Sequence, residues 1–386
     1  MKKLVVLGAT GSIGQSAAKV ARDIPERVRI VGLSAHGNGR LLAEMAGEFT
    51  DAALCVTDPE ALAAFPEALR KERRFFEGEE GLIDLATLPE AEMVLIAIVG
   101  TGGLRPALAA IEAGKDLAIA SKEILVMAGG IVMEAARRKG VNILPVDSEH
   151  NAIFQCLEGA RRRPASELTR LILTASGGPF RQTASGRLPQ VTPAEALKHP
   201  TWSMGAKITI DSATLFNKGL EMIEARWLFD VEMGRVDVIV HPQSIVHSMV
   251  EFADGSILAQ LSHSDMCFPI QYAVTWPERV PNTLRPLDFA ALGRLEFEAP
   301  RYDVFPALDL ARQAGETGGT LPAVLNAANE VAVEAFLGGR LSFPGIWETV
   351  AATMGQHRSI ADPSLNDIVV ADQEARRCAA EAVSRS

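Results

Sequence analysis

The sequence predicts an α/β protein with an N-terminal doubly wound parallel sheet, a central α+β domain with a mixed or antiparallel sheet, and a C-terminal helical bundle. Three observations predict it: short apolar segments alternate with amphipathic stretches, a hairpin signal follows, and only helical periodicity remains near the C-terminus. A chain of 386 residues is expected to form two or three domains. We place them at residues 1–147, 148–276 and 303–386, with a linker at 277–302.

The strand candidates in the first part are short and nearly all apolar, which is typical of strands buried on both faces of a parallel sheet. They are residues 3–7, 29–33, 52–56, 92–97, 116–120 and 141–146. Pro106 lies near the start of one intervening helical stretch and Gly114 ends it, as expected for a helix. This alternation predicts a Rossmann-like sheet.

A different pattern begins after Asp147. We expect helices at residues 150–157 and 212–229 and strands at 168–174, 236–241, 244–252 and 256–262. The last two strands flank the turn signal Ala253-Asp-Gly255, which predicts a hairpin in a second sheet.

The C-terminal part is predicted to be helical. Residues 277–300 hold four prolines and little periodicity, so we interpret them as a linker. Helical periodicity then covers residues 306–315, 321–337, 345–354 and 372–383, which predicts a small bundle.

Composition excludes several classes of protein. The net charge of −10 leaves no general electrostatic footprint for nucleic acid, although a few local donors could still bind a small anion. The longest apolar run, residues 93–99, is too short to cross a membrane. The isolated cysteines favour a reducing compartment, and we expect a cytoplasmic protein; they are Cys55, Cys156, Cys267 and Cys378.

The segment Gly8-Ala-Thr-Gly-Ser-Ile-Gly14 follows the first strand and opens a helix. Glycines there let the backbone approach a pyrophosphate, which the free N–H groups of the helix start can bind. Thr10 and Ser12 add hydroxyl donors. We expect a dinucleotide site; the alternative is a purely structural turn.

The end of the second strand indicates which dinucleotide binds. An NAD-selective site usually has an acidic residue there, and residues 33–40 contain none. Polar side chains in this stretch could instead receive a 2′-phosphate, which favours NADPH; they are Ser34, His36, Asn38 and Arg40. The alternative is a surface loop without cofactor contact.

Asp147 and Glu149 follow the last strand of this part. In an extended segment, side chains two residues apart share a face about 7 Å apart, which suits two carboxylates that bind one hard divalent cation. The alternative is an ordinary solvated pair. Lys122 and Glu123 follow the strand at 116–120, where Lys122 could contact a substrate hydroxyl or phosphate and Glu123 a ribose. The alternative is a common surface pair.

Further polar residues lie in the central part. Ser212, Asn217 and Lys218 are donor types that hold a phosphate, and Glu221 is a third candidate metal ligand. The alternative is a capped helix with an ion pair between Lys218 and Glu221, three residues apart.

Two loops complete these candidates. Ser176 and the glycines after it could form a phosphate nest, and the loop with His199 and Trp202 could close over a substrate. The alternative is an irregular connector with Trp202 in a core. We interpret His241, His247 and His263 as structural.

With these segments, the chain resembles the 1-deoxy-D-xylulose 5-phosphate reductoisomerase family over nearly its whole length. The blocks that carry the resemblance are residues 8–14, 145–154, 176–180, 211–214, 217–221, 241–244 and 325–330. The resemblance implies the NADPH- and metal-dependent isomerisation and reduction of 1-deoxy-D-xylulose 5-phosphate to 2-C-methyl-D-erythritol 4-phosphate, in non-mevalonate isoprenoid biosynthesis. It leaves open Mg²⁺ or Mn²⁺, and ketol migration or retro-aldol with aldol addition.

The resemblance also implies residue roles. Mg²⁺ or Mn²⁺ would bind Asp147, Glu149 and Glu221. The substrate's oxygen-bearing carbons would contact Lys122 and Ser148, and its phosphate Ser176, Ser212, Asn217 and Lys218. His199 would position substrate, while Trp202 and Met204 would lie on a lid. NADPH would contact Thr10, Gly11, Ser12, Ile13, His36, Gly37, Asn38, Ser121, Glu123 and Gly205. The α+β domain would be catalytic and would also pair two subunits into a homodimer, with no nucleic-acid or membrane partner.

Two positions depart from the family pattern. Ser121 stands where the family commonly has Asn, and Cys267 stands where it often has Arg. The alternatives to this function are an NADP-dependent dehydrogenase of the aspartate-semialdehyde or homoserine type and a non-catalytic NADP sensor. The first leaves three acids and a phosphate cluster without a role.

Overall fold

The structure is a computed structural model that describes residues 1–158, 167–202 and 204–385. The chain forms two compact units. The first unit contains residues 1–124, 130–151 and 265–286. The second contains residues 125–129, 152–264 and 287–386. The domain limits expected from the sequence stay a prediction.

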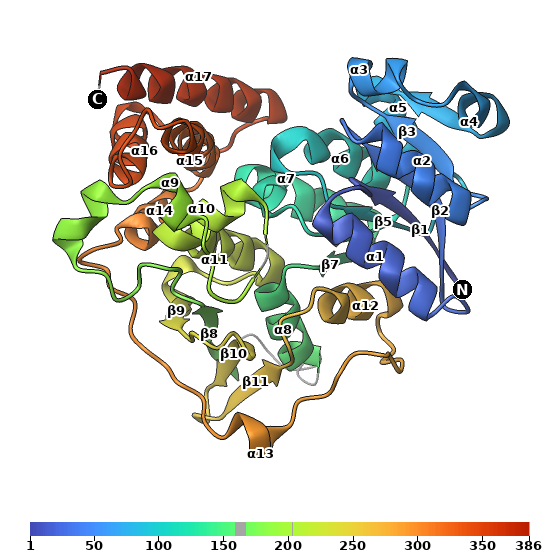
Figure 1. Cartoon of the computed structure of the whole chain (residues 1–386). Helices are drawn as coiled ribbons and strands as arrows, with labels where there is room; N and C mark the ends of the chain where they lie inside the picture. Colours follow the sequence, from blue (N-terminus) through green and yellow to red (C-terminus); the bar gives the residue numbers. More distant parts are fainter. Residues whose placement is uncertain (159–166, 203, 386) are drawn as a thin grey trace. The chain divides into compact units, whose positions relative to one another are not determined.

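The first unit contains a parallel sheet, drawn mainly in blue and teal in Figure 1. Its strand order in the described residues is β4-β3-β2-β1-β5-β6-β7, and every pairing is parallel. The strands are β1 Lys2–Leu7, β2 Val28–Ala35, β3 Ala53–Val56, β4 Phe75–Glu77, β5 Met93–Ile96, β6 Asp116–Ile119 and β7 Ile143–Pro145. The predicted parallel sheet is confirmed. β4 is not among the strands predicted from the sequence, since three residues between helices carry no periodicity.

The chain reverses its direction across this sheet between β4 and β5. It runs outward from β1 through β4 on one side and from β5 through β7 on the other. Right-handed crossovers place helices on opposite faces of such a sheet, and ligands of this fold bind in a crevice at the carboxyl ends of the strands where the order reverses, here β1 and β5. The helices of this unit are α1 Ser12–Asp23, α2 Gly39–Glu48, α3 Pro59–Ala63, α4 Glu67–Glu72, α5 Gly78–Ala86, α6 Leu104–Glu112 and α12 Cys267–Thr275, with most of α7 Lys122–Lys139 and the start of α8 Ser148–Leu157.

The second unit contains a mixed sheet of order β11-β10-β8-β9. Its strands are β8 Leu168–Ala175, β9 Val236–Val240, β10 Val246–Phe252 and β11 Ile257–Leu261. The hairpin between β10 and β11 is confirmed, and Gly255 in its turn has a φ of +82° that favours glycine. β8 and β9 pair in parallel, which makes the sheet mixed.

The helices of the second unit confirm the helical C-terminal part but differ from expectation at two places. They are α9 Pro193–Ala196, α10 Ala206–Thr214, α11 Phe216–Phe229, α13 Phe289–Leu292, α14 Ala307–Thr317, α15 Leu321–Leu337, α16 Gly345–Gln356 and α17 Leu365–Val383. The single helix expected at 212–229 is wrong, because Leu215 has a φ of 66° and separates α10 from α11. The helix expected from 372 begins earlier, where Ser364 and Asp367 form a capping box.

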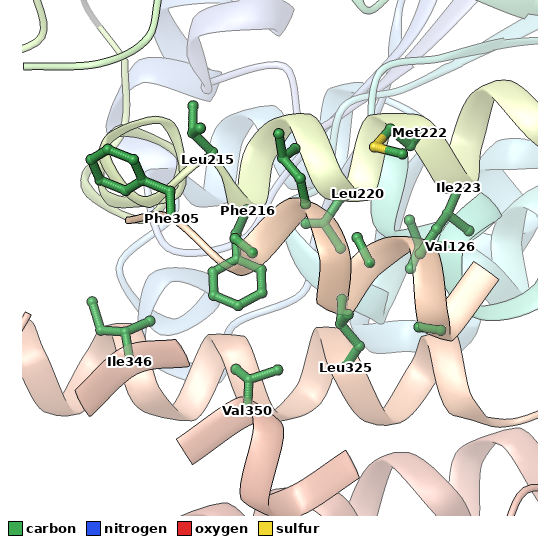
Figure 2. Close-up of a cluster of buried hydrophobic side chains, with 14 of the residues drawn as sticks. Val126, Leu215, Phe216, Leu220, Met222, Ile223, Phe305, Leu325, Ile346 and Val350 are labelled. Atoms are coloured by element: carbon green, nitrogen blue, oxygen red, sulfur yellow. The ribbon is translucent and has the colours of Figure 1, made fainter. Parts of the chain in front are cut away.

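The core of the second unit joins its helices. Figure 2 shows Phe216 and Leu220 of α11 near Leu325 of α15, with Ile346 and Val350 of α16 in the same cluster. All five side chains are fully buried. This packing therefore holds α11, which carries three candidate site residues, against the C-terminal bundle.

Among the described helices, none combines the length and the apolar character that crossing a bilayer would require.

Replacing Ile346 by alanine should lower the free energy of unfolding by about 2–5 kcal/mol, because the side chain is fully buried and leaves a cavity. Urea unfolding followed by circular dichroism measures the loss. Val369→Ala on α17 is the control, since Val369 is 39% exposed and should cost about 0.5 kcal/mol or less. Equal losses in both variants would contradict the proposed packing.

Candidate functional site

The glycine-rich turn of the first unit fits a dinucleotide. Gly8 has a φ of +85°, and a Cβ there would lie 2.5 Å from the Ala97 carbonyl oxygen. A Cβ on Gly14 would lie 2.4 Å from the carbonyl oxygen of Ala9. Gly11 precedes α1 without a side-chain cap, and the first turn of α1 holds no acid. The helix start therefore offers N–H groups to an anion at a position that only a backbone without side chains can approach.

The end of β2 holds four polar candidates. Ser34 is buried, and its hydroxyl accepts a 3.0 Å hydrogen bond from the Gly8 N–H, so it supports the glycine turn, and its role toward a phosphate stays a prediction. The exposed His36 lies with its Nδ1 2.9 Å from the Thr57 hydroxyl. Asn38 caps α2, since its Oδ1 accepts from the Leu41 N–H. The exposed Arg40 contacts Glu44.

The loop at residues 97–103 is not among the candidates predicted from the sequence. It lies beside the glycine turn, after β5, where the strand order of the sheet reverses between β1 and β5. Val99 in this loop is 82% exposed, and Gly100 has a φ of 74°. Three glycines directly after an apolar strand were the available signal. This loop is a further candidate for cofactor contact because it borders the crevice.

Residues at the start of α7 lie next to this loop. The Ser121 hydroxyl donates to the Ile98 carbonyl, so this serine supports the loop from the side of β6. Glu123 is buried in the first turn of α7. Lys122 is buried too, and its Nζ lies 2.5 Å from Oδ2 of Asp147.

The geometry expected for Asp147 and Glu149 is wrong in one respect. They do not lie on one extended segment, because α8 begins at Ser148 and Glu149 lies in its first turn. The Asp147 carboxylate accepts a 3.3 Å hydrogen bond from the Glu149 N–H. The Ser148 hydroxyl donates to Oε2 of Glu149 at 2.7 Å. The start of the helix thus brings both carboxylates to the carboxyl end of β7.

The charge on Asp147 is stabilised by its neighbours. Burial by itself would raise the pKa of this carboxyl, but the ammonium of Lys122 and the nearby His150 ring outweigh burial and hold the pKa well below its usual range. His150 Nδ1 lies 3.7 Å from Oδ1. Asp147 is therefore an ionised oxygen donor at neutral pH, as a hard divalent cation requires.

In the second unit the structure brings Ser176, His199 and Ser212 together. His199 Nε2 lies 3.0 Å from the hydroxyl oxygens of both serines. Gly177 and Gly178 have φ values of 80° and 66°, and the Gly178 N–H donates to Ser176 Oγ. These clustered N–H and O–H groups are the kind of donors that bind a phosphate monoester.

The loop after His199 contributes to this set. Nδ1 of His199 accepts hydrogen bonds from the backbone N–H groups of Trp202, at 2.9 Å, and Thr201, at 3.2 Å. The neutral imidazole therefore carries its hydrogen on Nε2 and donates toward the serines. The Trp202 ring is half-buried, 6.4 Å from the His247 ring, so neither a core tryptophan nor a fully exposed one is observed.

Three more candidates lie on α11. Asn217 Nδ2 donates to Glu221 Oε1 at 2.6 Å, and Lys218 Nζ donates to Oε2 of the same carboxylate. Both Lys218 and Glu221 are buried. The helical spacing predicted from the sequence is confirmed, and a buried carboxylate with nearby cationic and amide donors results.

The remaining candidates are less directly placed. Gly205 precedes α10, and its carbonyl accepts from the Thr209 N–H. Met204 is half-buried, and Ser203 lies outside the described residues. His241 and His247 are buried and contact the backbone carbonyls of Glu296 and Ser262, which agrees with structural roles.

Family models match most of this chain. The model described as 1-deoxy-D-xylulose 5-phosphate reductoisomerase matches residues 4–129. The model of that enzyme's C-terminal domain matches residues 143–229, and the DXP reductoisomerase C-terminal domain matches residues 261–378.

Relatives and solved structures cover the same span. The chain is 54% identical to the 1-deoxy-D-xylulose 5-phosphate reductoisomerase of Symbiobacterium thermophilum, over 99% of each chain. It is 50% identical to that of Pelotomaculum thermopropionicum, over 97% of each. The enzyme from Zymomonas mobilis in complex with NADPH has a TM-score of 0.92 at 43% identity, covering all of both chains. DOX-P reductoisomerase with NADPH, fosmidomycin and magnesium has a TM-score of 0.94 at 41% identity, covering 100% of this chain and 98% of the other.

His199 should titrate at a pKa of about 4, because burial disfavours its charged form. Since an unfolded histidine titrates near 6.5, the unfolded chain binds the proton first, and stability should fall as pH drops from about 6.5 toward 4. Histidine-selective NMR measures the midpoint, with His199→Gln to assign the signal. A midpoint above pH 6 would show that the ring is not held neutral.

Proposed function

We propose, since this chain belongs to the 1-deoxy-D-xylulose 5-phosphate reductoisomerase family, that it converts 1-deoxy-D-xylulose 5-phosphate to 2-C-methyl-D-erythritol 4-phosphate in non-mevalonate isoprenoid biosynthesis. NADPH and a divalent metal ion are its cofactors. The observation that carries the proposal is the full-length match to a relative that binds NADPH and magnesium. The donor cluster of Ser176, His199 and Ser212 supports it, because a phosphorylated substrate needs such a site.

The carboxylates of Asp147, Glu149 and Glu221 would bind Mg²⁺ or Mn²⁺. These oxygen donors are the type that hard cations prefer, and Asp147 and Glu221 are buried or nearly so. When bound, the ion would polarise the oxygens of an α-hydroxyketone, while NADPH would supply the hydride for reduction. The chain's lysines contact two of these carboxylates in the structure, so binding of the ion would release Lys122 and Lys218 toward the substrate.

The chain's own residues would orient the substrate. Lys122 and Ser148 would contact its oxygen-bearing carbons from the start of α7 and α8. The phosphate would receive hydrogen bonds from Ser176, Ser212, Asn217 and Lys218. His199 would donate through Nε2, and its Nδ1 would order the Trp202 loop, which with Met204 would exclude water. Binding energy gained at the phosphate would thus align the reacting carbons.

NADPH would lie along the crevice of the first sheet. Its pyrophosphate would meet Thr10, Gly11, Ser12 and Ile13. The 2′-phosphate would meet the turn of His36, Gly37 and Asn38, where no acid stands at the end of β2. Ser121, Glu123 and Gly205 would complete the site. Ser121 would act mainly through the backbone, since its hydroxyl donates to Ile98.

A homodimer and a cytoplasmic location belong to the same proposal. β11 is at the edge of its sheet, and Ile257 and Leu258 on it are 50% and 49% exposed, which supports pairing with a second copy. Light scattering measures the mass in solution. The four cysteines form no disulfide, which supports a reducing compartment.

Turnover should require both a sugar phosphate and a divalent ion. NADPH oxidation with 1-deoxy-D-xylulose 5-phosphate should stop when EDTA is added and return with excess Mg²⁺ or Mn²⁺. A plain dehydrogenase would not need the ion, and an NADP sensor would show no turnover with any substrate. Either result would defeat the proposal. NADH should be the poorer reductant.

Glu149→Gln should nearly abolish turnover and leave the affinity for NADPH close to normal, because the amide keeps the size of the side chain but loses the anionic ligand. Steady-state rates and NADPH fluorescence titration separate the two effects. Glu67→Gln, at an exposed surface pair, is the matched control. Loss of NADPH binding in the Glu149 variant would mean a structural role.

Lys218→Ala should raise KM for the phosphorylated substrate about tenfold to a hundredfold, since a charge-assisted hydrogen bond is lost. KM for NADPH should stay within about twofold of its normal value. Lys198→Ala is the control, because Lys198 is an exposed lysine of the same unit. An unchanged KM would remove Lys218 from the phosphate site.

A further inference from the structure

The segment Asn326-Ala-Ala-Asn-Glu330 on α15 has no role in the function described so far. Asn326 and Asn329 are fully buried. Asn326 Nδ2 donates to Glu330 within its own helix at 3.1 Å. Asn329 instead reaches a different helix, α10, which carries the candidate phosphate contact Ser212.

The partner of Asn329 is the residue directly before Ser212. Asn329 Nδ2 donates to Oδ1 of Asp211 at 2.8 Å. Lys207, one turn earlier on α10, lies 2.7 Å from Oδ2 of the same carboxylate. Asp211 is 1% exposed. Both oxygens of this buried carboxylate are therefore held, one from its own helix and one from the C-terminal bundle.

Ser212 has little room to move. Its hydroxyl lies 3.0 Å from His199 Nε2. A Cβ on Gly178 would lie 2.8 Å from the carbonyl oxygen of Ser212, so the backbone of Ser212 packs directly on the glycine turn. If α10 rotated or shifted, the distances from Ser212 to His199 and to the glycine turn would change. The contacts of Asp211 oppose such a movement.

Burial of the Asn329 amide adds little net stability, which favours a role in positioning. A buried amide loses its hydration, and its Oδ1 makes no hydrogen bond within the described part of the chain. One hydrogen bond returns little net stability for this loss. Its contribution is direction, because an amide N–H fixes where the Asp211 carboxylate lies.

We propose that Asn329 is a positioning residue of the phosphate site, which aligns Ser212 by holding Asp211. This inference rests on the proposed function in taking Ser212 as a phosphate contact. It assigns a role in substrate affinity to the C-terminal helical bundle, and it predicts that Asn329 and Ser212 act as one unit.

The test compares Asn329→Ala with Asn326→Ala, an equally buried asparagine on the same helix whose hydrogen bond stays inside α15. For Asn329→Ala we expect KM for 1-deoxy-D-xylulose 5-phosphate and Kd for inorganic phosphate by calorimetry to rise about tenfold. KM for NADPH and kcat should change less than about twofold. Asn326→Ala should leave KM and Kd unchanged. Equal effects of the two variants, or none for Asn329→Ala, would overturn the proposal.

A double-mutant cycle with Ser212→Ala tests whether Asn329 acts through Ser212. On the Ser212→Ala background, Asn329→Ala should raise Kd for phosphate less than about twofold, because the residue that it aligns is gone. A full tenfold effect there would mean that Asn329 acts otherwise, and the proposal would fall.

The remaining outcomes separate this proposal from the function. If Asn329→Ala fails to fold, a double variant that combines Asp211→Asn with Asn329→Asp serves instead, because the exchange restores one amide–carboxylate hydrogen bond. This double variant should bind phosphate more tightly than Asn329→Asp alone. No recovery of affinity would overturn the proposal. Absence of turnover in the unmodified protein, with phosphate binding still weakened by Asn329→Ala, would defeat the proposed function and leave the positioning role intact.

Discussion

Buried negative charge is the constraint on which this site depends. Asp147, Asp211 and Glu221 are carboxylates with little or no exposure, and each contacts a lysine of its own unit. A carboxylate buried without a partner would cost several kcal/mol, so the fold must provide cations or donors beside each one. The polar residues around the site are therefore requirements of folding as well as of chemistry.

The same constraint separates a binding carboxylate from a positional one. Asp147 and Glu221 each contact one lysine, and both carboxylates are ligands of the proposed metal site. Asp211 also receives a hydrogen bond from Asn329 on another helix, which fixes its direction. The partner on a second helix distinguishes Asp211, because a buried amide on a packed helix holds the carboxylate in one direction.

Departures from the sequence analysis have local causes. Glu149 is helical because the Asp147 carboxylate caps the start of the helix. The two acids therefore approach each other through a helix start and not along one extended strand. Leu215 interrupts a continuous helical pattern with a left-handed backbone conformation. Leucine rarely adopts this conformation, so the sequence gives no sign of the break. Ser34 is buried beneath the glycine turn, where its hydroxyl accepts a hydrogen bond from the Gly8 N–H.

The sequence by itself determined most of the strands and helices, the glycine turn and the set of polar residues, because periodicity, turn chemistry and spacing are properties of neighbouring residues. Only the tertiary structure decided which side chains meet: that His199 lies between two serines from different segments, and that α15 reaches Asp211. Contacts between residues distant in the chain depend on packing of whole elements, and no local pattern encodes a hydrogen bond across more than a hundred residues.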